Sequence, residues 1–371
     1  MPAQPITLDN LRQYAVARSF FAPTSLLAAI KRLGFVQADP IRAPARAQDL
    51  TLRHRVKGYR AGDLEQRYAA LDVEEDFFIN YGFLPRSTQA LMHPRTPRVV
   101  WPKVRMAQAE AVLAFVQERG TVHPREVDAH FAHGRVRNWF GGSTSASTQL
   151  LDGMHYRGLL RIAGRANGVR MYSATVAAVA HLPQTCADAA AVMDALVDVI
   201  VHKYAPLPER SLRELIGMLR GGAPQWDAHR PAAFARAKAR LPNAEIDGTV
   251  WYWPQGESPT ARRHAAAQDG IVRLLAPFDP VVWDRRRFEL LWGWAYRFEA
   301  YTPAAKRIRG YYALPLLWRD QVIGWGNLLV KDGVLHTELG FVKGHAPRDK
   351  AYLAGLGEEL SGMENFLGLH S

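Results

Sequence analysis

The feature that most constrains this fold is a pattern that occurs three times in residues 1–255: short amphipathic helices followed by two strand-like segments. In the clearest copy, a predicted helix over Val104–Arg119 ends at Gly120, and a short second helix begins at Pro124. After a third helix, Leu160–Ala163 and Val169–Tyr172 form a predicted β-hairpin. This order is typical of a winged helix, so the chain is predicted to be α+β with three tandem winged-helix units.

The predicted division of the chain follows these copies. The winged helices are expected at 1–102, 103–180 and 181–255, and a β-rich domain at 270–371. The stretch GGSTSAST (141–148) is interpreted as a loop with a helix N-cap, although its composition would also suit a flexible linker. In the last domain, strand-like runs that include YRFEAY (296–301) alternate with turns, and a helix over 347–360 closes the chain.

Charge is the clearest compositional signal. Lys and Arg number 47 against 35 Asp and Glu, a formal net charge of +12. This excess favours a polyanionic partner, foremost nucleic acid, although a merely basic enzyme would share it. The basic residues are dispersed, which indicates a folded basic surface instead of a disordered arm.

Several other classes of protein are disfavoured. The single cysteine, Cys186, excludes disulfide scaffolds and cysteine-based zinc sites. No run reaches the roughly 18 apolar residues of a membrane span, and the first residues do not resemble a secretory signal. We therefore expect a cytoplasmic protein with no membrane partner.

Familiar catalytic motifs are mostly missing. The sequence has neither a GxxxxGK[ST] phosphate loop nor a GxSxG nucleophile elbow. His130 and His133 are interpreted as surface residues and not as metal ligands. The acidic run Glu74–Asp76 is interpreted as a solvated edge.

The segment Val36–Asp39 is the most specific candidate for chemistry. Side chains alternate along a strand, so Gln37 and Asp39 are expected to project from the same face. A carboxylate beside an amide could form a catalytic site that stabilises an electron-poor carbon atom. The alternative is structural: Asp39 and Pro40 would suit the N-cap and first position of a following helix.

The run from Trp283 to Tyr312 interleaves aromatic and basic residues, a composition that suits both a nucleic-acid surface and a β-domain core. We assign its aromatic residues Trp292, Trp294 and Phe298 to the core. The basic residues of this run that we expect to face DNA are Lys306, Arg307 and Arg309.

Three segments together carry a resemblance to a known family. FVQADPIRAPARA, GFLPRS and LLAPFDPVVWDRRR…YRFEAYTPAAKRIRGYYALPLLWRDQVIGW resemble winged-helix crosslink-repair DNA glycosylases of the YcaQ/AlkZ type, and the likeness is densest over Leu274–Trp325. The resemblance implies a curved basic channel around duplex DNA. It also implies excision of alkylated purines, particularly N7-linked guanine adducts, and in some members the unhooking of interstrand crosslinks.

The resemblance also implies site residues. The family signature of glutamine, an apolar residue and then glutamine or aspartate is matched by Gln37, Ala38 and Asp39. Relatives often carry an aromatic–small–His–Glu stretch where this chain has Phe77–Asn80, so the substrate range is expected to differ. The basic residues expected to bind DNA are Arg46, Arg86, Arg157, Lys306, Arg307 and Arg309.

The expected activity is that of a monofunctional glycosylase without metal or organic cofactor. Asp39 would stabilise an oxocarbenium ion and activate water, and Gln37 would position the water or the sugar. The expected partner is duplex DNA with alkylated purines, bound by a monomer associated with the bacterial nucleoid. The alternative is a non-catalytic winged-helix DNA-binding protein or transcriptional regulator.

Overall fold

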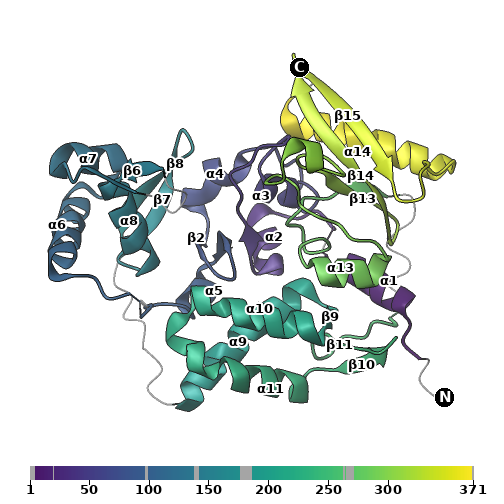
Figure 1. Ribbon diagram of the computed structural model, residues 1–371, viewed down its shortest axis with the longest axis horizontal. Helices are drawn as coiled ribbons and strands as arrows, with labels where there is room; N and C mark the ends of the chain where they lie inside the picture. Colours follow the sequence, from purple (N-terminus) through teal and green to yellow (C-terminus); the bar gives the residue numbers. More distant parts are fainter. Residues whose placement is uncertain are drawn as a thin grey trace. The chain divides into compact units, whose positions relative to one another are not determined.

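The computed structural model describes residues 5–19, 21–96, 99–137, 142–175, 186–261, 264 and 271–369 (Figure 1). The chain divides into two units. The first unit comprises Met1–Asp63, Val197–Ile216 and Phe234–Ser371, and the second comprises Leu64–Leu196 and Gly217–Ala233.

The N-terminal segment of the first unit begins with two helices, as the first copy of the repeated helix–strand pattern predicts. Thr7 caps α1 through a reciprocal pair of hydrogen bonds with Asn10, and α2 ends at Gly34 in the left-handed conformation that favours glycine. Phe35 and Val36 are then completely buried, which fixes the direction in which the chain leaves α2. The elements of this segment are α1 (Leu8–Arg18), α2 (Leu26–Leu33), β1 (Val36–Gln37) and α3 (Ala47–Leu52).

A three-helix region with a small antiparallel sheet occupies the middle of the sequence. The predicted strand pair is confirmed, because β10 and β11 pair antiparallel and β9 adds to β11. The boundary between the two units passes through all three helices. The elements are α9 (Cys186–Tyr204), β9 (Leu207–Pro208), α10 (Glu209–Gly222), η2 (Pro224–His229), α11 (Arg230–Arg240), β10 (Asn243–Ile246) and β11 (Thr249–Tyr252).

The C-terminal part of the first unit contains a four-stranded antiparallel sheet in the order β12-β13-β14-β15. Figure 1 shows α14 running along this sheet, and its side chains Tyr352, Met363 and Phe366 are buried. The elements are β12 (Val272–Leu274), α13 (Arg285–Trp292), η3 (Ala304–Lys306), β13 (Leu314–Trp318), β14 (Gln321–Lys331), β15 (Val334–Phe341) and α14 (Lys350–Leu367).

Two expectations for this region needed correction. The run 296–301 forms no strand: Tyr296 is held by donating its hydroxyl hydrogen to the Ala313 carbonyl, and the chain after it turns. The final helix begins three residues later than expected and extends seven residues further, because Asp349 caps it and Gly368 ends it. The core assignment of Trp292 and Trp294 is confirmed, since both side chains are buried.

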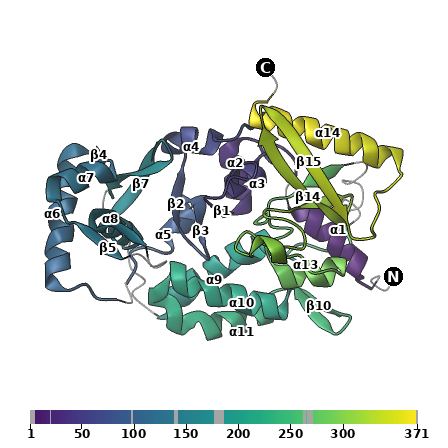
Figure 2. The same ribbon diagram turned by 45° about the horizontal axis from the view of Figure 1, so that its top comes forward.

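The second unit contains the clearest predicted winged-helix copy. Figure 2 shows α6, α7 and α8 gathered around β4 and β7, and the predicted hairpin is confirmed as β7 and β8 in a sheet of order β4-β8-β7. The predicted N-cap within GGSTSAST is confirmed, and it is Ser145 of α8, although residues 143–145 form a strand and not a loop. The elements are α6 (Lys103–Arg119), β4 (Thr121–Val122), α7 (Pro124–Phe131), β5 (Arg135–Arg137), β6 (Ser143–Ser145), α8 (Ala146–Tyr156), β7 (Leu160–Ala166) and β8 (Val169–Ala174).

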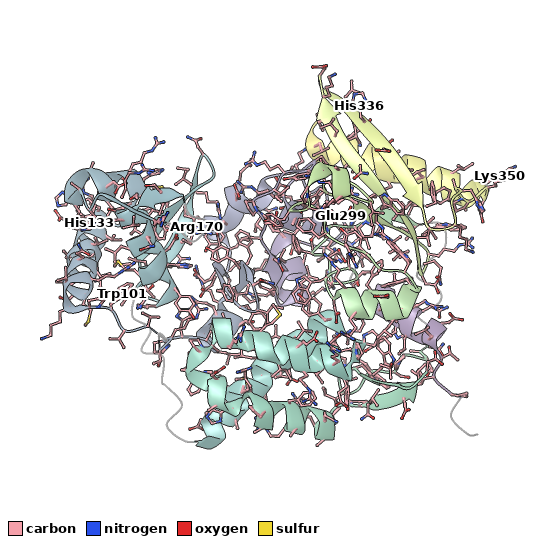
Figure 3. The ribbon with its side chains drawn as sticks, in the orientation of Figure 1. Trp101, His133, Arg170, Glu299, His336 and Lys350 are labelled. Carbon is pink, nitrogen blue, oxygen red and sulfur yellow. The ribbon has the colours of Figure 1, made fainter. Side chains whose placement is uncertain are left out.

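The acidic run on β2 is buried, so its interpretation as a solvated edge was wrong. Glu74, Glu75 and Asp76 are each 5% exposed or less. Glu74 pairs with Arg161 at 2.7 Å, and Glu75 pairs with the Arg170 that is labelled in Figure 3. Burial alone would raise the pKa of Glu75, but the neighbouring arginines lower it. The remaining elements of this unit are α4 (Asp63–Arg67), η1 (Tyr68–Ala70), β2 (Val73–Phe77), β3 (Tyr81–Pro85) and α5 (Arg86–Ala90).

Candidate active site

Gln37 and Asp39 lie at the end of β1, where buried apolar residues give way to half-buried polar ones. Gln37 is the last residue of the strand, and Asp39 follows two residues later in a turn. The Asp39 carboxylate accepts the Ile41 backbone N–H at 2.9 Å, and the Asp39 backbone N–H donates to Oε1 of Gln48 at 3.2 Å. Both the side chain and the backbone of Asp39 are therefore held in place.

The helix-capping interpretation of Asp39 and Pro40 was wrong. The next helix, α3, begins at Ala47 with Arg46 in the N-cap position. Between Pro40 and Arg46 the chain is irregular. Asp39 instead forms a local turn, in which one of its carboxylate oxygens accepts the Ile41 N–H. Helix capping therefore does not account for a charged side chain at this position.

Trp283 determines the orientation of the Gln37 amide. Its indole Nε1–H donates to Oε1 of Gln37 at 2.6 Å. An indole N–H can only donate, so the amide oxygen must be the acceptor and the amide NH₂ group must point elsewhere. The Trp283 ring packs against Tyr204 with 5.2 Å between ring centroids. Gln37 is thereby presented as a hydrogen-bond donor.

The environment of Asp39 makes its carboxylate more basic than usual. Burial raises its pKa above the ordinary value, and the hydrogen bond from Ile41 opposes this rise only in part. The charge of Asp39 also acts on Tyr312: burial first, and then Asp39, raise the pKa of this tyrosine. Tyr312 is 3% exposed and stays a neutral phenol.

A buried group of charges lies behind β1. Arg55 pairs with Asp279 at 2.8 Å, and both side chains are 1% exposed or less. Lys203 donates to the backbone carbonyl of Phe35, two residues before Gln37. Burial, and then the cation of Arg55, lower the pKa of Lys203 to about 7. Because this amine is enclosed, it supports the strand and is inaccessible to a substrate.

Four of the basic residues predicted to bind DNA belong to the first unit, and their surroundings differ. Lys306 is exposed in η3, whereas the Arg307 Nε–H donates to the Thr302 carbonyl and its guanidinium lies 5.0 Å from the Tyr311 ring. The Arg309 guanidinium lies over two indole rings, those of Trp294 and Trp325. Arg46 lies near Asp49. Burial raises the pKa of Asp49, and the positive charge of Arg46 opposes that rise only in part.

Arg86 and Arg157 belong to the second unit, and both have partners there. Arg86 is half exposed and donates to Glu74 at 2.9 Å. Arg157 lies 3.6 Å from the centre of the Trp101 ring and donates to the Val99 carbonyl. Their contact with DNA stays a prediction.

The sequence interpretation missed the residues that support Gln37 and Asp39. Trp283, Tyr204 and Tyr312 come from distant segments, and Tyr312 would be read as an ordinary core aromatic residue. Trp283 carried the strongest available signal, since it lies within the segment that resembles the glycosylase family. Its spacing could not show that its indole meets Gln37, 246 residues away.

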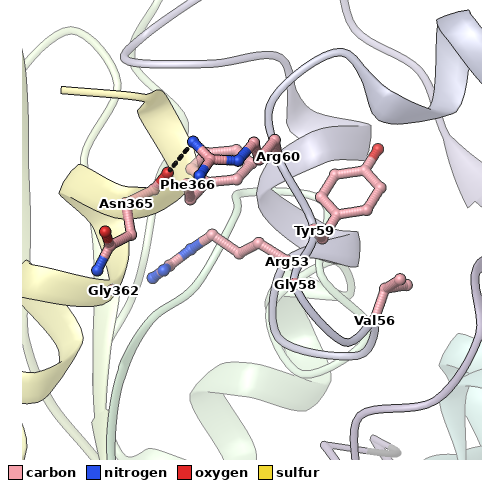
Figure 4. Close-up of a pocket in the computed structure, with 8 residues that line it drawn as sticks. All are labelled: Arg53, Val56, Gly58, Tyr59, Arg60, Gly362, Asn365 and Phe366. Atoms are coloured by element: carbon pink, nitrogen blue, oxygen red, sulfur yellow. Dashed lines mark hydrogen bonds between the residues drawn. The ribbon is translucent and has the colours of Figure 1, made fainter. Parts of the chain in front are cut away.

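A separate pocket of about 330 Å³ lies between the chain after α3 and the end of α14 (Figure 4). Arg53 pairs there with the buried Glu359, and Arg60 donates to the Asn365 carbonyl at 3.3 Å. None of the predicted site residues lines it. Within the described ranges, no cluster of three or more His, Cys, Asp or Glu side chains could hold a metal ion, and no helix could cross a membrane.

Comparison with known proteins identifies a family and a similar solved structure. The family model described as DNA glycosylase AlkZ-like matches residues 30–366. The fold is similar to that of the DNA glycosylase AlkZ from Streptomyces sahachiroi, with a TM-score of 0.63 over 98% of each chain and 13% identity. At this identity the structural likeness establishes the fold alone.

Proposed function

The chain belongs to the AlkZ-like DNA glycosylase family, and from this premise we propose that it hydrolyses the N-glycosidic bond of alkylated purines in duplex DNA. The observation that carries the proposal is that the half-buried Asp39 carboxylate follows, two residues on, the Gln37 amide that Trp283 orients as a donor. N7-alkylguanine adducts are the proposed substrates, including those that link two strands. The protein would act as a monomer on nucleoid DNA.

The proposed reaction uses few protein groups because the substrate supplies part of the driving force. An N7-alkylated guanine is cationic, so it leaves as a neutral base with the electron pair of the glycosidic bond. The deoxyribose then acquires oxocarbenium character, which the Asp39 carboxylate stabilises. Water forms the new bond to C1′ and transfers its proton to Asp39, while the Gln37 NH₂ group donates to the water oxygen. The product is an abasic site.

The environment of Asp39 supports its role as the base. Ile41 engages Oδ1, so Oδ2 is the oxygen that we assign to the water molecule. The raised pKa of this carboxyl increases its affinity for a proton near neutral pH. The enclosed position of Lys203 supports a monofunctional reaction, because this amine cannot reach C1′ to form a Schiff base.

We extend the proposal to the DNA-binding scaffold. Winged helices at 1–102, 103–180 and 181–255, with the β-rich domain at 270–371, would form a curved basic channel. Support comes from three antiparallel hairpins, β2–β3, β7–β8 and β10–β11, each of which follows at least one helix. The arginines on β7 and β8 that pair with Glu74 and Glu75 contribute little net charge, so phosphate contacts are assigned to residues such as Lys306.

The direct test is release of base from a duplex that carries one N7-alkylguanine, in buffer with a chelator. The proposal expects abasic sites at the adduct and intact undamaged strands. A protein that releases no base and instead protects one sequence, bound about a thousandfold more tightly than random duplex, would be a regulator.

Replacement of Trp283 by Phe tests the orientation of Gln37. Phenylalanine keeps the ring packed against Tyr204 but removes the N–H that holds the amide. We expect kcat to fall about tenfold, the cost of roughly one hydrogen bond to a positioned group, with KM near the wild-type value. In a Gln37→Ala background the same replacement should have little further effect. Equal losses in both backgrounds would assign Trp283 to folding alone.

Replacement of Lys306 by Ala tests the phosphate contact. The affinity of the wild-type protein for undamaged duplex should decrease steeply with salt. In Lys306→Ala the slope of log K against log[salt] should be shallower by about 0.9 for each lost phosphate contact. The double variant with Arg307→Ala should roughly double this change. Lys350→Ala is the control, because Lys350 (Figure 3) is also an exposed lysine and lies in α14. An unchanged slope in the double variant would remove these residues from the interface.

A further inference from the structure

The loop over 301–311 exposes large apolar and aromatic side chains. Tyr301 is 80% exposed, Ile308 is 72% exposed and Tyr311 is 44% exposed. Three such exposed side chains on one short loop are unfavourable in water and typical of an interaction site, and the loop over 301–311 is called the patch below. Lys306 lies exposed between them in the sequence, so the patch combines apolar groups with positive charge.

Glu299, which is labelled in Figure 3, holds the start of this loop and the segment over 308–310. The Glu299 carboxylate is buried and accepts the backbone N–H groups of Ile308 at 3.0 Å, Arg309 at 2.7 Å and Gly310 at 3.3 Å. Its backbone carbonyl also accepts the N–H of Thr302. Burial would raise the pKa of Glu299, but these N–H donors lower it, so the carboxylate stays charged.

The end of the loop is fixed by Asn327 and by two tryptophans. Asn327 donates its side-chain N–H to the Arg309 carbonyl at 2.7 Å, and the Arg309 guanidinium lies over Trp294 and Trp325. Gly310 has φ +119°, and a side chain there would collide with the Asn327 amide. A loop held at so many points presents Tyr301 and Ile308 with little conformational entropy to lose on binding.

A chain of aromatic contacts connects the loop to the candidate active site. Tyr301 lies edge-on to Phe298 with 6.0 Å between ring centroids, and Phe298 lies edge-on to Tyr312 at 5.3 Å. Tyr312 is the buried phenol on which the Asp39 charge acts. The exposed apolar side chains therefore lie on a loop whose aromatic contacts reach Tyr312, and Tyr312 is near enough to Asp39 for the charge of that carboxylate to act on it.

We propose that Tyr301 and Ile308 form a wedge that enters the base stack of duplex DNA beside the target nucleotide and keeps that nucleotide out of the stack. This proposal rests on the proposed glycosylase function. C1′ and its base are enclosed in a stacked duplex, so an enzyme that acts there must separate base steps, and rigid apolar side chains flanked by cations do so in DNA-bending proteins. Lys306 and Arg307 contact the adjacent phosphates.

The test measures unstacking without cleavage. The probe is a duplex with one 2′-fluoro-N7-methylguanine nucleotide, whose fluorine opposes oxocarbenium formation, next to the fluorescent base 2-aminopurine. Wild-type protein should increase the fluorescence several-fold, since 2-aminopurine brightens when it is unstacked. The Tyr301→Ala/Ile308→Ala variant should bind with an unchanged salt slope and remove most of this increase.

Two control variants separate the wedge from general damage. Tyr301→Phe keeps the ring and should preserve the fluorescence change. Leu353→Ala removes a similarly exposed apolar side chain, 56% exposed on α14, and should also leave it unchanged. On a cleavable, well-paired adduct, the double alanine variant should lose about tenfold to hundredfold in rate, and less when the adduct faces a mismatch that already weakens its stacking.

The outcomes distinguish this proposal from the function on which it rests. If wild-type protein releases no alkylated base, the proposed function fails, and the fluorescence change on the fluorinated duplex still tests the wedge. If wild-type protein releases the base and the double alanine variant matches it in both rate and fluorescence, the wedge is wrong and the function stands. Equal losses on paired and mismatched adducts would also overturn the wedge.

Discussion

Asp39→Asn should reduce the rate of base excision by a hundredfold or more, the scale typical of a positioned general base. Asparagine has nearly the same shape, and its side-chain oxygen can still accept the Ile41 N–H, so the local turn should survive. The negative charge does not survive, and a neutral amide neither stabilises an oxocarbenium ion strongly nor accepts a proton from water. The measurement is single-turnover release of an adduct that is stable to spontaneous depurination.

The pH dependence of wild-type excision provides an independent check on Asp39. The carboxylate is the active form, and its pKa is raised by burial, so the rate should decrease on acidification through a pH above the usual carboxyl range. The residual rate of Asp39→Asn should lack this decrease. Gln37→Ala should retain it and should lose less activity, because that variant keeps the charge.

The melting temperature of Asp39→Asn and its affinity for damaged duplex should stay near wild type, because the turn with Ile41 is kept. A purely structural role for Asp39 predicts that the excision rate also stays near wild type. A variant that excises at the wild-type rate would assign Asp39 to the turn alone, and the proposed site would have to be abandoned.

Asp279→Ala should destabilise the first unit by about 3–5 kcal/mol, the cost typical of removing one partner from a buried ion pair. Arg55 would remain charged in an enclosed position, where its own partners, the Ser19 and Thr51 carbonyls, cannot neutralise it. Lys203 would also lose the nearby anion that favours its charged form. The measurement is the shift of the denaturant-induced unfolding transition at constant slope.

Two further variants isolate the charge. Asp279→Asn keeps an acceptor for the Val281 backbone N–H and removes the charge. It should therefore show most of the loss of stability that Asp279→Ala shows. Asp198→Ala removes the partner of Arg240 in a solvent-exposed pair of the same unit and should cost about 1 kcal/mol or less. Similar losses from Asp279→Ala and Asp198→Ala would contradict the assignment of Asp279 to a buried, energetically important pair.

Much of the local structure is determined by the sequence alone. The ends of α1, α2 and α6 follow from Thr7, Gly34 and Gly120, because caps and left-handed glycines act within a few residues. The hairpin β7–β8 follows from alternating strands around the turn at Asn167 and Gly168. The family was also recognisable, because its most specific segments are continuous in the chain.

The tertiary structure decided what surrounds the polar residues. Glu74, Glu75 and Asp76 were interpreted as a solvated edge, but arginines from a distant hairpin pair with Glu74 and Glu75, and Arg95 pairs with Asp76. These partners offset the cost of burying the three carboxylates. In the same way, Trp283 reaches Gln37 across 246 residues and selects which end of its amide faces outward. Local patterns specify where a strand or helix begins and ends. The burial, charge and orientation of a side chain depend on neighbours that only folding brings together.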